Sequence, residues 1–204
     1  MNGLSRSTVL ATYARSFFIQ AAWNYHTMLG TGFAFTLMPG LRRIHGGDAE
    51  ALDAAASRHL EHFNAHPYLA GLAVGGVLHL EETAEDPAQI GRFKAAVRGP
   101  LGSLGDRLVW ARWLPLIALV SLVLYWLGAA WGVVVAFYLV VYNVGHLGLR
   151  AWALRAGLRA GRDVARDLGR AKLADRATRL GGPVALAAGA LGGALLMGPL
   201  RASE

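Results

Sequence analysis

The sequence predicts an all-α membrane protein, with amphipathic and re-entrant helices in its N-terminal part followed by about three transmembrane helices. Of its 204 residues, 54% are hydrophobic and 16% are charged, whereas ordinary soluble domains carry about 25% charged residues. Two long stretches in the second half of the chain carry no formal charge, and most of the net charge of +7 lies between them. The chain has no cysteine, which excludes disulfides, thiolate metal sites and a cysteine nucleophile. We expect no cleavable signal peptide.

Residues 16–41 are uncharged, but polar side chains recur along them at helical spacing. Intervals of four, three and four residues place four of these side chains on one face of a predicted helix: Gln20, Asn24, Thr27 and Thr31. An unpaired polar group facing lipid costs about 2–7 kcal/mol. We therefore expect this face to contact a partner subunit or a hydrated cavity, with Trp23 beside it able to stack on a sugar ring.

A second helix is predicted over residues 49–64, and the dipeptide His66-Pro67 just after it prevents the helix from continuing. The apolar segment that follows, 67–80, begins with proline at its first helical position and is too short to span a bilayer comfortably. A broken helix followed by a short apolar one is typical of re-entrant elements that line a cavity.

Polar groups flank this segment on both sides. Asn64 and His66 can each donate and accept hydrogen bonds, which suits a ligand rich in hydroxyl groups and equally suits capping of the helix end. Glu81 and Glu82 close the segment; they either accept hydroxyl groups as buried carboxylates or form a solvated surface pair. Carboxylates at a helix C-terminus oppose the macrodipole, so another interaction must favour them there.

Other motifs in the first half of the chain favour neither metal nor nucleotide chemistry. His59, His62 and His66 recur along one helix edge, but no HExxH is present and the break falls at His66, so we predict no metal site. The glycine-rich segment 99–106 lacks the GK[ST] ending of a phosphate loop. We expect close backbone packing there, with Asp106 as a cap or ligand.

Residues 113–149 form an uncharged stretch of 37 residues, which would be about 56 Å long as a single helix. A hydrocarbon core is about 30 Å thick, so we predict a transmembrane hairpin that turns near residues 128–132. A second uncharged stretch, 180–200, is long enough to span once. It contains a GxxxG motif at Gly189 and Gly193, which favours close approach of another helix.

Between these stretches, residues 150–179 contain nine basic and three acidic side chains. Arginines at helical spacing form one stripe: Arg155, Arg159, Arg162, Arg166 and Arg170. We predict a basic amphipathic helix at the cytoplasmic headgroups, serving as a docking surface or as a lipid-facing anchor. Nucleic-acid binding is disfavoured because no aromatic residue other than Trp152 interleaves the arginines. The predicted parts are a helical core, 1–112, and a segment with the hairpin, basic helix and final span, 113–204.

Several spaced motifs together resemble the enzyme IID component of the mannose/fructose/sorbose-type phosphotransferase system. They run through nearly the whole chain: residues 15–25 (RSFFIQAAWNY), 58–60 (RHL), 63–71 (FNAHPYLAG), Glu81-Glu82, Lys94, 99–101 (GPL) and Gly105-Asp106. Asn143, His146, Arg150, Gly157 and Gly161 fit the second half of the family more loosely.

The resemblance implies a multi-pass subunit of the bacterial inner membrane that pairs with a IIC subunit in an oligomeric complex. That complex carries a hexose such as mannose, which a phospho-IIB domain charged by IIA phosphorylates. The IID subunit is itself non-catalytic, and no nucleophile, cofactor or catalytic residue is predicted here. The resemblance makes eight residues candidates for the sugar site or the IIC interface: Gln20, Trp23, Asn24, Asn64, His66, Glu81, Glu82 and Asp106. The alternative is a non-transporting regulatory or assembly protein that docks phosphotransferase partners.

Overall fold

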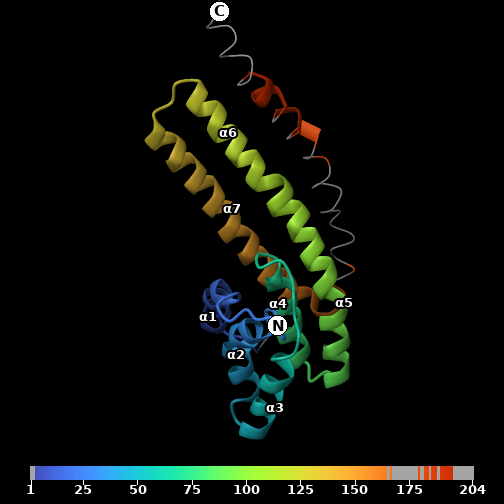
Figure 1. The fold of residues 1–204 in the computed structure, drawn as a ribbon. Coiled ribbons are helices and arrows are strands. Elements are labelled where there is room, and N and C mark those ends of the chain that lie inside the picture. Colours follow the sequence, from blue (N-terminus) through green and yellow to red (C-terminus); the bar gives the residue numbers. More distant parts are fainter. Residues whose placement is uncertain are drawn as a thin grey trace, which may run out of the picture. The chain divides into compact units, whose positions relative to one another are not determined.

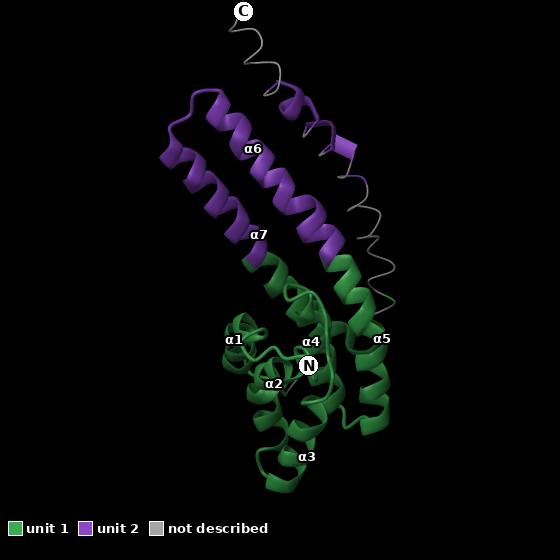
Figure 2. Ribbon diagram, viewed as in Figure 1, with its two compact units in different colours: residues 1–105, 147–171 green, residues 106–146, 172–204 purple. Residues whose placement is uncertain are grey.

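The computed structural model describes residues 3–164 and, beyond them, 166, 179, 182, 183, 185–187 and 189–194. Within this part of the chain the regular elements are helices, with isolated bridges pairing Asn24 with Met28 and Met28 with Phe63. The chain divides into two compact units (Figure 2). The first contains Met1–Gly105 and Leu147–Ala171, and the second contains Asp106–His146 and Lys172–Glu204. The division predicted at residue 112 assigned 147–164 to the second part, whereas in the structure these residues group with the first unit.

The first unit is a cluster of helices around the apolar helix α4 (Figure 1). Its elements are α1 (Arg6–Arg15), η1 (Ser16–Phe18), α2 (Gly30–His45), α3 (Ala49–His59), α4 (Ala70–Glu82), α5 (Pro87–Gly105), the second half of α7 (Trp131–Ala160) and η3 (Gly161–Asp163). Helix α4 is apolar on every side and is buried along almost its whole length, with α2 and α5 packed against it.

Glycines allow α7 to pack directly against the backbone of α4. A Cβ placed at Gly75 would lie 2.5 Å from the carbonyl oxygen of Leu154 and 2.5 Å from the amide nitrogen of Leu158. A Cβ placed at Gly157 would meet the backbone of Leu72 in return. This contact belongs to the small-residue type that brings helices together in membranes.

Helix α7 continues without a break from the apolar stretch into the basic segment, which was predicted as a separate helix. Over residues 150–164 the predicted amphipathic character is confirmed: Leu154 and Leu158 are buried, whereas Arg155 and Arg159 are exposed. The rest of the segment 150–179 lies mostly outside the described residues.

The second unit contains the predicted hairpin, formed by η2 (Asp106–Trp113), α6 (Leu114–Trp126) and the first half of α7. The turn lies at the predicted place, with Gly128 in the left-handed conformation at φ +89°. The Trp113 ring packs on Gly145 and stacks on Tyr142, with ring centroids 5.9 Å apart.

In the part of the chain that the structure describes, two helices are long and apolar enough to cross a membrane, Pro87–Trp126 and Trp131–Asp163. Apolar side chains of the second, such as Val140 and Val144, are exposed, unlike those of a helix in a soluble core. The predicted third span, 180–200, lies largely outside the described residues.

Three predictions about local structure are wrong. Residues 19–29 form a loop of turns, so the polar stripe from Gln20 to Thr31 does not exist as a helix face. Helix α3 ends at His59, earlier than the predicted residue 64, and α4 begins at Ala70 after a turn at residues 67–69. The glycine-rich segment up to Gly105 lies within α5, and the helix continues past it, so Asp106 is not a cap.

Candidate functional site

The loop formed by residues 19–29 is anchored at its N-terminal end by a buried arginine. The Arg150 guanidinium donates a 2.7 Å hydrogen bond to the carbonyl oxygen of Ser16. It also lies between two aromatic rings, 5.0 Å from the centroid of Phe17 and 4.9 Å from that of Tyr68. Arg150 therefore joins α7, the start of the loop and the turn before α4.

The C-terminal end of the loop is held by backbone pairing with the segment between α3 and α4. The amide of Leu29 donates to the carbonyl of Phe63 at 2.8 Å, and the amide of Phe63 donates to the carbonyl of Thr27 at 3.2 Å. Met28, between them, adopts a left-handed conformation with φ +54°, which is uncommon for a residue other than glycine. The loop is thus fixed beside Phe63 and hence beside the predicted site residue Asn64.

Asn24 shapes the loop from within and explains why no helix forms. Its Oδ1 accepts hydrogen bonds from the backbone amides of His26 (3.0 Å) and Thr27 (2.9 Å), and its Nδ2 donates to Thr27 Oγ1 at 2.8 Å. Local bonds of this kind compete with helical hydrogen bonds. The Asn24 side chain is therefore engaged by its own loop.

The outer surface of the loop presents aromatic and amide side chains. Trp23 is 46% exposed and Tyr25 is 83% exposed, and their rings meet edge to face with centroids 4.8 Å apart. Gln20 and Asn64 are also exposed, and neither side chain has a hydrogen bond to another described residue. We call Gln20, Trp23, Tyr25 and Asn64 the loop surface.

His66 is buried behind this surface. Its Nδ1 accepts a hydrogen bond from the backbone amide of Tyr68 at 3.2 Å, and the two rings meet edge to face. Gly105 of α5 packs directly on the imidazole, so a larger residue there would displace it. His66 therefore fixes the turn that leads into α4.

Glu81 is buried at the end of α4 and binds side chains from α2 and α3. Arg58 donates to both carboxylate oxygens, Nε to Oε1 at 3.0 Å and the terminal nitrogen to Oε2 at 2.8 Å. His59 Nε2 lies 2.8 Å from Oε1, and His45 Nε2 lies 3.0 Å from Oε2. A carboxylate has about four acceptor positions, so this Glu81 cluster leaves none for a hydroxyl ligand.

The charges in the cluster follow from burial and bonding. Burial alone would raise the pKa of Glu81, but the hydrogen bonds from His59, Arg58 and His45 outweigh it and lower the pKa to about 2. Burial lowers the pKa of His59, more than its bond to Glu81 raises it. His59 is therefore neutral at neutral pH and donates through Nε2, while its buried Nδ1 has no hydrogen-bond partner in the described part of the chain.

The remaining predicted residues lie apart from these contacts. Glu82 is half-buried at the end of α4, and Asp106 is exposed at the start of η2 in the second unit. His62 lies against Arg98, with Nδ1 3.2 Å from the guanidinium, so His59, His62 and His66 have different partners. Among the described residues no group of histidines and carboxylates could hold a metal ion.

Sequence reasoning assigned no role to the residues that hold the site in place: His45, Arg58, Lys94 and Arg150. Lys94 of α5 donates a 2.6 Å hydrogen bond to the carbonyl of Arg58, which stabilises the C-terminal turn of α3. One signal could have revealed the Glu81 cluster. A carboxylate that ends an apolar helix needs a cationic partner, and the pair Arg58-His59 lies in the preceding helix.

Comparison with known proteins agrees with this architecture. The family model for the PTS system mannose/fructose/sorbose family IID component matches residues 3–192. The mannose-specific EIID component of Escherichia coli (strain K12) is 31% identical over 171 residues, which cover 81% of this chain and 60% of that protein. The sorbose-specific EIID component of Klebsiella pneumoniae is 28% identical, with 81% and 61% covered. The chain thus spans about 60% of the length of these relatives.

Solved structures show the same fold. The cryo-EM structure of the mannose transporter ManYZ with microcin E492 aligns with a TM-score of 0.72 at 28% identity. A second structure, described as that of a membrane protein, aligns with a TM-score of 0.82 at 27% identity. Each alignment covers 92% of this chain and 70% of the solved chain. With the family match over most of its length, this chain belongs to the mannose/fructose/sorbose family of the phosphotransferase system as a IID membrane component.

Proposed function

We propose that this chain pairs with a IIC subunit and, together with it, carries a hexose such as mannose across the bacterial inner membrane. A phospho-IIB domain, charged by IIA, phosphorylates the sugar on the cytoplasmic side. IID components of this family work with other phosphotransferase subunits, and relatives are named for mannose and sorbose. The chain contributes contacts and positioning, and the phosphoryl transfer belongs to its partners.

The observation that carries this proposal is the loop surface on its rigid support. Trp23 and Tyr25 are exposed aromatic residues of the kind enriched at the energetic centre of protein interfaces. Because Arg150 and Phe63 fix the two ends of the loop, little entropy is lost when a partner covers it. Gln20 and Asn64 add amide groups that can bond to a IIC backbone or to sugar hydroxyls.

The eight predicted site residues have different roles in this proposal. Gln20, Trp23 and Asn64 contact the IIC subunit or the sugar directly. Asn24, His66 and Glu81 act as positioning residues, since their polar atoms bind neighbouring parts of this chain. Glu82 and Asp106 are accessible acidic groups that we assign to the IIC interface rather than to the sugar.

Transport in cells that lack mannose-family permeases tests the proposal. The chain is co-expressed with the IIC subunit and the IIA and IIB proteins of its own organism, and uptake of labelled mannose and co-purification of IIC are measured. We expect Trp23→Ala to reduce both at least tenfold at unchanged membrane levels of the chain. Trp131→Ala, which removes a tryptophan that is 76% exposed outside the loop surface, serves as the matched control.

Asn64→Ala separates the two roles of the loop surface. Loss of uptake with retained IIC co-purification would assign Asn64 to the sugar, and loss of both would assign it to the interface. Uptake that does not require this chain at all would contradict the proposed function. It would favour a regulatory or assembly role.

A further inference from the structure

A groove of about 960 Å³ lies between α1 and the second half of α7, both in the first unit. Its two walls are tied together by the Tyr13 hydroxyl, which donates to the carbonyl oxygen of Leu147 at 3.1 Å. Three arginines line the groove, Arg6 from α1 and Arg155 and Arg159 from α7. None of its lining residues is acidic.

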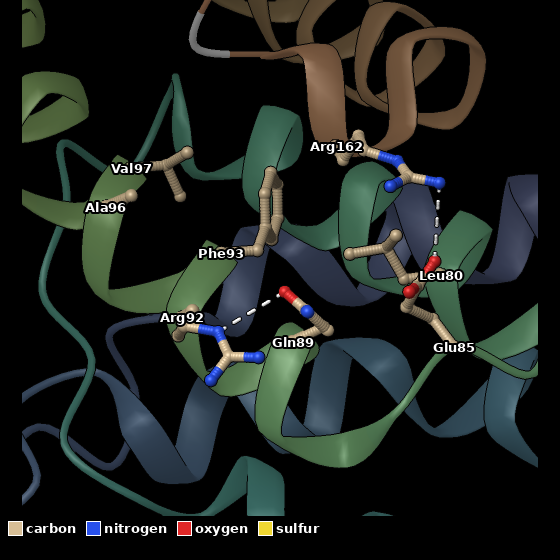
Figure 3. A pocket seen from close by; sticks show the side chains of 8 residues that line it. All are labelled: Leu80, Glu85, Gln89, Arg92, Phe93, Ala96, Val97 and Arg162. Carbon is tan, nitrogen blue, oxygen red and sulfur yellow. Dashed lines mark hydrogen bonds and ion pairs between the residues drawn. The ribbon is translucent and has the colours of Figure 1, made fainter.

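Two other arginines, both in the basic segment, are paired with carboxylates. Arg162 forms an ion pair with Glu85 at 3.6 Å, in a separate pocket of about 250 Å³ (Figure 3). Arg166 forms an ion pair with Asp163 at 2.6 Å. By contrast, the guanidinium groups that line the groove have no carboxylate or carbonyl partner within the described residues. Among the described residues, the positive charge of these three arginines is therefore uncompensated.

Apart from Tyr13, the rest of the groove is aliphatic. Leu4, Val9 and Leu10 line it from the N-terminal side, and Leu154 and Leu158 line it from α7. Leu10 is 67% exposed and adds accessible apolar surface to the groove. A soluble anion such as phosphate would leave this apolar surface in water.

The position of the groove along α7 matches the edge of a membrane. In the sequence of α7, the uncharged stretch ends at Leu149 and the first groove arginine follows six residues later. Trp152 lies between them and is 41% exposed. Exposed tryptophan followed by arginine marks the level of lipid headgroups in membrane helices.

We propose that this groove binds an anionic phospholipid. Arg155 and Arg159 lie one helical turn apart and bind the headgroup phosphate together with Arg6. An acyl chain covers the aliphatic side chains that line the groove. The bound lipid would join α1 to α7 and so support the start of the loop, since Arg150 anchors that loop from the same helix. The proposal does not depend on which sugar or partner the chain serves.

Native mass spectrometry of the full chain in detergent tests the proposal. Phosphatidylglycerol and phosphatidylcholine are titrated against the wild type and the double variant Arg155→Gln/Arg159→Gln. Each basic group near anionic lipid contributes about fivefold in affinity, so we expect phosphatidylglycerol to bind about tenfold to thirtyfold more weakly to the variant. The double variant Arg42→Gln/Arg43→Gln removes the same charge from exposed positions at the end of α2 and should bind as the wild type does.

Two further measurements separate a lipid from a free anion. Leu10→Gln keeps every arginine but removes apolar surface from the lining of the groove, so it should weaken phosphatidylglycerol binding severalfold. Inorganic phosphate and glycerol phosphate should not displace the lipid. Equal binding of the two lipids, an equal loss in the Arg42/Arg43 control, or displacement by inorganic phosphate would each overturn the proposal.

Discussion

Replacing Glu81 by glutamine should destabilise the first unit strongly, because the carboxylate connects three helices. The substitution keeps the size of the side chain but removes its charge and one of its two acceptor oxygens. Arg58 would lose a bidentate partner, and either His45 or His59 would face an amide group in place of an oxygen. Breaking a buried ion pair by removing one partner typically costs about 3–5 kcal/mol.

The lowered pKa of Glu81 points to a cost of similar size. It is lowered from 4.5 to about 2, and each unit corresponds to about 1.36 kcal/mol, so the ionised carboxylate contributes about 3 kcal/mol to folding. The side chain is 2% exposed, so solvent screening reduces this value little. The two estimates agree, and we expect a loss of about 3 kcal/mol for Glu81→Gln. For a chain of this size that corresponds to a decrease in Tm of about 6–12 °C.

Intrinsic tryptophan fluorescence during heating in detergent provides the assay, since the chain contains six tryptophans. Glu82→Gln is the matched control. It makes the same chemical change at the next residue, whose side chain has no ion pair with another described residue, and it should shift the Tm by less than about 2 °C. A Glu81→Gln protein that unfolds within 2 °C of the wild type would refute the reasoning.

The sign of the pH dependence follows from the lowered pKa. A carboxyl group with a lower pKa in the folded state stabilises that state at pH values above its unfolded pKa. This contribution is complete above pH 4.5 and is lost as the pH falls towards about 2. The wild type should therefore lose about 3 kcal/mol across this interval that Glu81→Gln does not lose.

Three further substitutions test the packing of the first unit and its loop. Gly75→Ala places a Cβ against the backbone of Leu154 and should cost about 1–3 kcal/mol in thermal unfolding, whereas Gly91→Ala, in open space on α5, should be neutral or slightly stabilising. Asn24→Ala removes the side-chain bonds of the loop and should speed its amide hydrogen exchange severalfold without a large change in Tm; unchanged exchange would contradict the role given to Asn24. Met28→Val should be less stable than Met28→Gly, because a β-branched residue is strained at φ +54°; the reverse order would show that this strain is negligible.

The sequence predicted the hairpin well because its signal is a simple one. An uncharged stretch that is longer than one membrane span and has glycines near its middle can form few structures other than a transmembrane hairpin. The turn at Gly128 lies where the composition placed it. The amphipathic start of the basic segment followed in the same way from the spacing of Arg155 and Arg159.

The N-terminal loop could not be predicted from periodicity. Polar residues at intervals of three and four are typical of a helix face, and residues 20–31 carry that pattern by coincidence. What decides the backbone is the Asn24 side chain and pairing with Phe63, a residue more than thirty positions away. Long-range pairing of this kind leaves no local pattern.

The same limit applies to Glu81. Its position at the end of an apolar helix indicated an unusual environment, and the sequence left open a ligand or a solvated surface. The structure shows neither of these: the Glu81 carboxylate is buried and fully hydrogen-bonded. This arrangement depends on Arg58, His59 and His45, which other helices place beside it.

The Glu81 cluster and the loop surface are nevertheless parts of one packed structure. The His59 ring meets Phe33 at 6.3 Å, and Phe33 stacks on Phe63 at 4.1 Å, so rings in contact lead from the buried carboxylate to the backbone that pairs with the loop. The interior polar groups therefore determine where the exposed ones lie. Glu81→Gln should therefore loosen the loop as well as the helices, and hydrogen exchange at residues 24–29 should rise more than exchange in the turn near Gly128, which belongs to the second unit. Equal changes at both places would show that the Glu81 cluster supports the fold as a whole and has no specific role in holding the loop.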